Sequence, residues 1–225
     1  MGLNHLASHY ETLGLNARAA EHLRQAIEKT PEKKDLMALR GKVYFLLGED
    51  AAALESFLKV PSDSNFFSHS IYIATQLCNK PVCADQLMTR IAATYSLLSN
   101  PAEVDHDNFT TEIALTKLMI QQNGYTADTK PLLLRALEAS KNTSYVNWKG
   151  AETLWTARIH TALGEQSLAL KEIESFVNRG GHNASFKNDP DFEPLKTNPR
   201  MTELLSAMDN KRIEQTKQLK GNSTF

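Results

Sequence analysis

The sequence predicts an all-α protein in which helical hairpins stack into a solenoid and a helix caps its C-terminal end. Three observations support this fold class. Matching residues recur at an offset of 34, among them Gly14 with Gly48 and Tyr10 with Tyr44. In each clear copy, a Leu-Gly pair is followed by Ala five residues after the Gly and by a bulky apolar residue four further on. No long stretch alternates apolar and polar residues as half-buried strands do.

The first two copies cover residues 1–34 and 35–62, and each signature position has a physical role. The glycine ends the first helix, where a left-handed cap is easiest without a Cβ. The alanine lies where the second helix crosses the first, and a larger side chain there would hold the two helices apart. The bulky residues fill the space between the helices. These positions are Tyr10, Gly14, Ala19 and Leu23 in the first copy and Tyr44, Gly48, Ala53 and Phe57 in the second.

Residues 63–149 carry degenerate copies, and residues 150–183 carry another clear one with Gly164 and Ala169. Apolar spacing predicts two helices on either side of the NKPV turn. Gly124, followed by Leu133 and Ala136, marks a further weak copy. These segments bring the expected number of hairpins to about five.

Residues 184–208 are expected to cap the last hairpin, because terminal repeats need a cover over their apolar face. Asn198 is expected to be the N-cap of a short final helix that begins at Pro199. Residues 209–225 are predicted to be a polar tail that frays. The first copy has no such segment before it, so we expect either that ordered structure precedes Met1 or that something else covers that end. The expected lid residues are Phe192, Leu195, Met201 and Leu204.

This spacing resembles the tetratricopeptide repeat, which has 34 residues, two antiparallel helices, Gly before the turn, and Ala with a bulky residue on the second helix. The resemblance is specific in residues 1–62 and 150–183. The piece DPDFEPLKTNPRMTELL resembles a signature that follows such repeats in many bacterial proteins. The resemblance implies an α-α superhelix whose concave groove binds a protein or peptide segment.

The family's groove positions, carried over residue by residue, combine cationic, acidic and apolar side chains. Lys42 and Arg158 are expected to hold a carboxylate-bearing peptide, with Phe45 as an apolar contact. In the alternative interpretation, these side chains are merely solvated. The clamp that some members use for C-terminal carboxylates is not present, because Ser8 and Lys42 stand where it needs Asn. The expected groove residues are Ser8, Glu11, Lys42, Phe45, Arg158 and Thr161.

Composition and motifs favour a binding protein over an enzyme. The formal net charge is −1, so no basic excess indicates nucleic-acid binding. No phosphate-binding, zinc-protease or nucleophile-elbow motif occurs. We therefore expect a non-enzymatic, cytoplasmic scaffold with no cofactor, no metal and no membrane contact from this chain.

Cys78 and Cys83 flank a proline turn in CNKPVC. They are either two small apolar residues at helix ends or a reversible local disulfide in an oxidising compartment. A zinc site is not expected, because no second pair of ligands has suitable spacing.

The alternative function is a sensory or interaction domain of a larger bacterial signalling protein. The C-terminal signature resembles that of winged-helix transcription regulators, adenylate cyclases and serine/threonine kinases that carry such repeats. In that case the chain is expected to be a periplasmic domain of a membrane-anchored regulator, and Cys78 and Cys83 are a possible redox pair.

Overall fold

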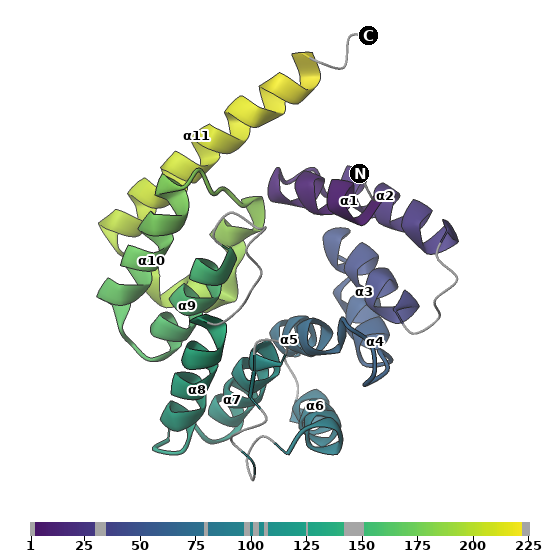
Figure 1. Cartoon of the computed structure of the whole chain (residues 1–225), viewed down its shortest axis with the longest axis vertical. Coiled ribbons are helices and arrows are strands. Elements are labelled where there is room, and N and C mark those ends of the chain that lie inside the picture. The colour runs from purple at the N-terminus through teal and green to yellow at the C-terminus, as the bar shows by residue number, and fades with distance from the viewer. Residues whose placement is uncertain are drawn as a thin grey trace. The chain divides into compact units, whose positions relative to one another are not determined.

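The computed structural model describes residues 3–29, 35–78, 81–96, 100, 104–105, 108–124, 126–141 and 151–221. Every regular element in these ranges is helical, so the all-α prediction is confirmed. Ten α-helices follow one another in five pairs, and two 3-10 helices and a last α-helix come after them within the described residues (Figure 1). The elements are α1 (Leu3–Thr12), α2 (Asn16–Lys29), α3 (Leu36–Leu46), α4 (Asp50–Phe57), α5 (Phe67–Leu77), α6 (Pro81–Thr94), α7 (Phe109–Asn123), α8 (Thr129–Lys141), α9 (Ala151–Ala162), α10 (Gln166–Asn178), η2 (Ala184–Asn188), η3 (Pro190–Leu195) and α11 (Pro199–Gly221).

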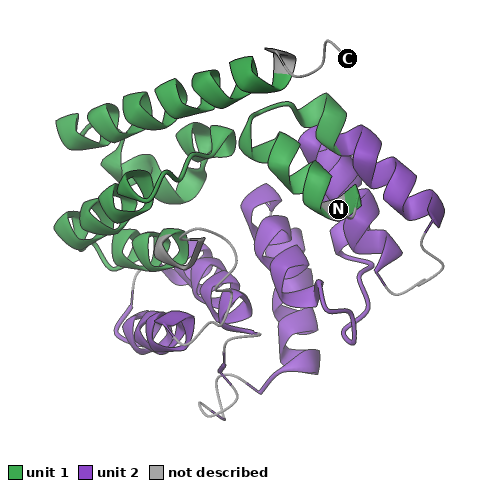
Figure 2. Cartoon of the chain, turned by 45° about the horizontal axis from the view of Figure 1, so that its top comes forward, with its two compact units in different colours: residues 1–19, 145–225 green, residues 20–144 purple. Residues whose placement is uncertain are grey.

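The chain divides into two compact units, coloured separately in Figure 2. Unit 1 combines residues 1–19 with residues 145–225, and unit 2 holds residues 20–144. The N-terminal helix α1 therefore belongs with the C-terminal segment, which the repeat pattern alone does not predict.

The turn inside three helix pairs repeats one hydrogen-bond pattern. Gly14, Gly48 and Gly164 adopt φ values of 75°, 75° and 77°, which are strained for residues with a Cβ. The amide of the residue after each glycine donates to the carbonyl five positions earlier, as in a Schellman cap. The pairs are Leu15 to Tyr10, Glu49 to Tyr44 and Glu165 to His160. The predicted role of these glycines is confirmed.

The signature alanines are fully buried, as the crossing of two paired helices requires. Ala19, Ala53, Ala136 and Ala169 are each 0% exposed. Phe57, the bulky partner in the second pair, is 1% exposed. These positions therefore lie in the packed interior of their helix pairs, as predicted for the crossing residues.

Replacement of Ala53 by Leu is expected to lower the free energy of unfolding by about 1–3 kcal/mol, because extra methylenes in a filled core force the helices apart. Urea unfolding followed by circular dichroism measures the change. Ala51→Leu is the matched control, since Ala51 is exposed on the same helix. Equal midpoints for the two variants would show that Ala53 is not at the crossing.

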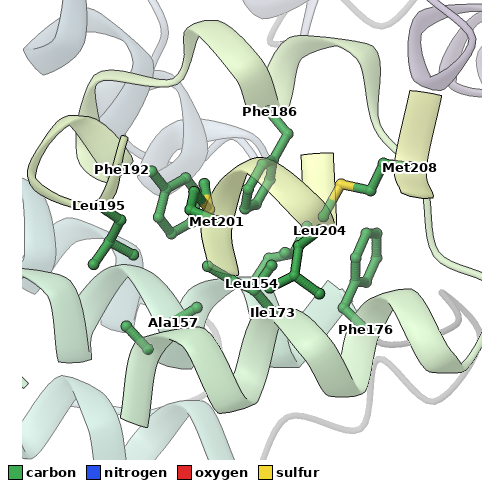
Figure 3. Close-up of a cluster of buried hydrophobic side chains, with 11 residues drawn as sticks. Leu154, Ala157, Ile173, Phe176, Phe186, Phe192, Leu195, Met201, Leu204 and Met208 are labelled. Carbon is green, nitrogen blue, oxygen red and sulfur yellow. The ribbon is translucent and has the colours of Figure 1, made fainter. Parts of the chain in front are cut away.

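The expected lid residues lie in the apolar core of unit 1. Side chains from α9, α10, η2, η3 and α11 meet in one apolar cluster (Figure 3). The side-chain oxygen of Asn198 accepts a hydrogen bond from the backbone N–H of Arg200 at 2.9 Å, which is the expected N-cap. The four predicted lid residues are all buried: Phe192, Leu195, Met201 and Leu204.

The prediction of a short final helix and a fraying tail is wrong. α11 continues to Gly221, and polar contacts stabilise its second half. The Arg212 side chain reaches the backbone carbonyl of Leu13 at 3.5 Å and Asp209 at 3.3 Å. Lys211 pairs with Glu214 one helical turn away at 3.2 Å. The sequence of this segment lacks a strong apolar stripe, so its helix was not evident.

The C-terminal segment also contacts α1. A Cβ on Gly14 would lie 2.8 Å from the Cβ of Ala184 in η2. The turn after α1 therefore needs glycine both for its positive φ and for this close approach. η2 therefore covers part of the first hairpin, at the turn after α1.

Candidate functional site

Two lysine–aromatic pairs lie on neighbouring helices of unit 2. On α3, the Lys42 ammonium is 5.8 Å from the centre of the Phe45 ring. The Lys117 ammonium of α7 is 5.2 Å from the centre of the Tyr72 ring on α5. Because α5 packs against both α3 and α7, the two pairs stand on adjoining helices. Each pair combines a cation with an aromatic face, as in cation–π contacts.

Of the two lysine–aromatic pairs, the sequence indicated only Lys42 with Phe45. Lys42, Phe45 and Lys117 are half-buried, and Tyr72 is 3% exposed. Lys117 and Tyr72 lie in the degenerate segment, where no clear repeat assigns groove positions. An aromatic residue and a lysine from two different helices leave no local signal in the sequence.

The other predicted groove residues belong to unit 1. Ser8 and Glu11 are half-buried on α1. Thr161 is 6% exposed, and its hydroxyl donates to the backbone carbonyl of Ala157 at 2.8 Å. Thr161 therefore has an internal contact where the resemblance implies a groove-facing one.

Arg158 is likewise engaged within unit 1. Its guanidinium, 14% exposed, lies 2.6 Å from a carboxylate oxygen of Asp189 and 3.6 Å from one of Asp191. The same group lies 4.8 Å from the Trp155 ring centre and 5.3 Å from that of Phe192. Arg158 thus holds the start of η3 against α9. The sequence offered no signal for this, because Asp189 and Asp191 follow Arg158 by 31 and 33 residues.

A second buried ion pair links α7 and α8 in unit 2. The Glu112 side chain is 0% exposed, and Arg135 donates to one of its carboxylate oxygens, with the Arg135 Nε at 2.9 Å. The other oxygen, Oε2, is buried without a hydrogen-bond partner. Burial raises the pKa of Glu112 to about 7, and the pairing with Arg135 opposes this rise.

The raised pKa of Glu112 predicts a pH-dependent stability. The native state holds this proton more tightly than the unfolded chain, so the contribution to stability is complete below about pH 4.5 and is lost as the pH rises through about 7. Glu112→Gln removes the titration. We expect the unfolding free energy of the wild type to fall relative to that of Glu112→Gln across this interval.

Urea titrations at several pH values measure the difference. Glu138→Gln on α8 is the control, because the Glu138 side chain is 71% exposed. If the free energies of unfolding of the wild type and of Glu112→Gln changed in parallel with pH, the burial of an ionisable Glu112 would be contradicted.

A hollow of about 470 Å³ lies between α4 and α6 in unit 2. Val82 on its rim is 69% exposed. The Arg90 guanidinium donates to the backbone carbonyl of Val60 and lies 5.5 Å from the Phe67 ring centre. Burial lowers the pKa of Arg90. The lining residues are Leu58, Val82, Asp85, Gln86, Thr89 and Arg90.

Cys78 and Cys83 are joined in a disulfide between the end of α5 and the first turn of α6. Their Cα atoms are 5.8 Å apart, which lies within the usual range for disulfides. Of the two interpretations that the sequence left open, the structure has the local disulfide.

Within the described ranges, no three His, Cys, Asp or Glu side chains gather where they could hold a metal ion. None of the described helices is both long enough and apolar enough to span a bilayer. The chain matches no protein-family model, and neither the curated proteins nor the solved structures yield a match.

Proposed function

We propose that the chain is a non-enzymatic binding scaffold, a tetratricopeptide-like array of hairpins that receives an acidic segment of a partner protein on α3, α5 and α7. The lysine–aromatic pairs carry this proposal. Lys42 and Lys117 place two positive charges on these helices, and Phe45 adds half-buried aromatic surface beside one of these charges. Such combinations of an aromatic anchor and a cation are typical of binding hot spots.

The hairpin geometry supports the same proposal. Repeated helix pairs present a row of first helices, and α3, α5 and α7 are the first helices of three consecutive pairs. Repeat proteins use such rows as extended binding surfaces. Arg158 and Thr161 are left out of the proposed surface because both are engaged within unit 1.

Charge reversal tests the proposal. We expect Lys42→Glu with Lys117→Glu to abolish capture of partners that the wild-type protein retains from its source cells, as quantified by mass spectrometry. Raising the ionic strength should weaken the same wild-type interactions, because salt screens exposed charges. Circular dichroism establishes that the variant is folded.

Lys59→Glu is the matched control. The Lys59 side chain is 61% exposed, and its ion pair within the described residues is the local one with Glu55 at 2.6 Å. We expect the Lys59→Glu variant to capture the same partners as the wild type. Retention of every partner by the double variant would refute the assignment of this surface.

A second candidate function is the interaction domain of a larger bacterial signalling protein, in the cytoplasm or as a periplasmic domain. The signature DPDFEPLKTNPR favours it, because it forms the folded cap around Phe192 and Leu195. Intact mass of the endogenous protein distinguishes the candidates. A mass near 25 kDa favours a free-standing scaffold, and a much larger mass favours the signalling protein.

A further inference from the structure

The two sulfurs of the disulfide have different surroundings. Cys78 directly follows α5, is 4% exposed, and its backbone N–H donates to the carbonyl of Thr75 at 3.3 Å. Cys83 is half-buried on α6, and the neighbouring Val82 is 69% exposed. Cys83 is therefore the more accessible residue of the pair, and an external thiol reaches it more readily than it reaches Cys78.

The position of Cys83 in its helix favours the reactive form of the thiol. α6 has 14 residues, and Cys83 is the third of them. No acidic residue lies in this first turn. The partial positive charge of a helix N-terminus stabilises a thiolate, and the thiolate is the attacking species in disulfide exchange.

The position of α6 does not depend on the disulfide alone. When the disulfide opens, α6 is still anchored by three side chains that are at most 3% exposed: Ala84, Leu87 and Ile91. Opening of the disulfide therefore leaves the packing of these three side chains in place.

We propose that Cys78 and Cys83 form a thiol–disulfide exchange site in which Cys83 makes the mixed disulfide with a small thiol or disulfide and Cys78 resolves it. This role is independent of the proposed binding function. It assigns the chain a reversible modification site whose co-reactants are low-molecular-weight thiols and disulfides.

The oxidation half of the cycle balances with glutathione disulfide as the oxidant. The Cys83 thiolate attacks one sulfur of glutathione disulfide, forms a mixed disulfide and releases one glutathione thiolate. The Cys78 thiolate then attacks the sulfur of Cys83 and displaces the second glutathione. The protein loses two electrons and two protons, and glutathione disulfide gains them as it becomes two glutathione molecules.

The experiment compares Cys78→Ser and Cys83→Ser after reduction, each treated with glutathione disulfide at neutral pH and followed by intact mass. We expect Cys83 in the first variant to gain one glutathionyl group at least about tenfold faster than Cys78 in the second. The reduced wild type should lose two hydrogens without accumulating the adduct, because Cys78 removes it.

A parallel reaction in concentrated guanidinium is the control, since unfolding exposes both cysteines and the two rates should converge. Cys78→Ala and Cys83→Ala repeat the comparison if circular dichroism shows that a serine variant is not folded. Equal rates in the folded variants, faster reaction of Cys78, or a stable glutathione adduct on the wild type would each overturn the proposal.

Discussion

Arg158→Ala is expected to lower the free energy of unfolding of unit 1 by about 3–5 kcal/mol, because removal of one partner leaves buried carboxylates without compensation. The side chains of Asp189 and Asp191 are 8% and 9% exposed. The variant also removes the cation from between the Trp155 and Phe192 rings. A loss of this size is a large part of the stability of an ordinary domain.

Tryptophan fluorescence during urea unfolding reports on this unit through Trp155, whose ring centre lies 4.8 Å from the Arg158 guanidinium. Arg200→Ala is the matched control in the same unit. Arg200 pairs with Glu174, but their side chains are 47% and 41% exposed, so its loss is expected to cost less than about 1 kcal/mol. Similar midpoints for the two variants would contradict a structural role for Arg158 in the cap.

Phe57→Ala is expected to destabilise unit 2 by about 3–5 kcal/mol, since the ring is buried between α3 and α4 and its removal leaves a cavity. Phe57 is 1% exposed. Its ring also occupies the space beside Gly41, where an added Cβ would approach ring atoms to 2.7 Å. The Phe57 ring therefore leaves no space for a side chain at position 41.

This contact predicts that the effect of Gly41→Ala on the free energy of unfolding changes sign when Phe57 is replaced by alanine. Gly41→Ala in the wild type should cost about 1–3 kcal/mol through overpacking. In the Phe57→Ala background the same change should stabilise by about 0.5–1 kcal/mol, because alanine is the better helix former. A double-mutant cycle by urea unfolding measures the coupling, and additive effects would show that the two residues are not in contact.

Local chemistry explains which parts of the fold the sequence revealed. Gly14, Gly48 and Gly164 were predictable because only a residue without a Cβ adopts their φ easily. Ala53 was predictable because a helix crossing requires a small residue at a fixed distance from the turn. The cap was evident from its apolar residues and from Asn198 before a proline.

Contacts between distant segments explain what the sequence did not reveal. Arg158 looked like a free cation for a ligand, but its acidic partners follow 31 and 33 residues later, and no periodicity connects them. Glu112 and Arg135 meet across two helices without a recognisable repeat signature. The second half of α11 contacts the carbonyl of Leu13, near the other end of the sequence, and no local pattern indicates this contact.

The most direct test of the scaffold function places a photo-crosslinking phenylalanine analogue at position 45 on α3, and at position 134 on α8 as the control. Leu134 is also in unit 2 and is 45% exposed. In source-cell extract, we expect the analogue at position 45 to label a discrete partner through an acidic segment, and the analogue at position 134 to label none. Equal labelling from both positions, or none from position 45, would contradict the proposed binding surface.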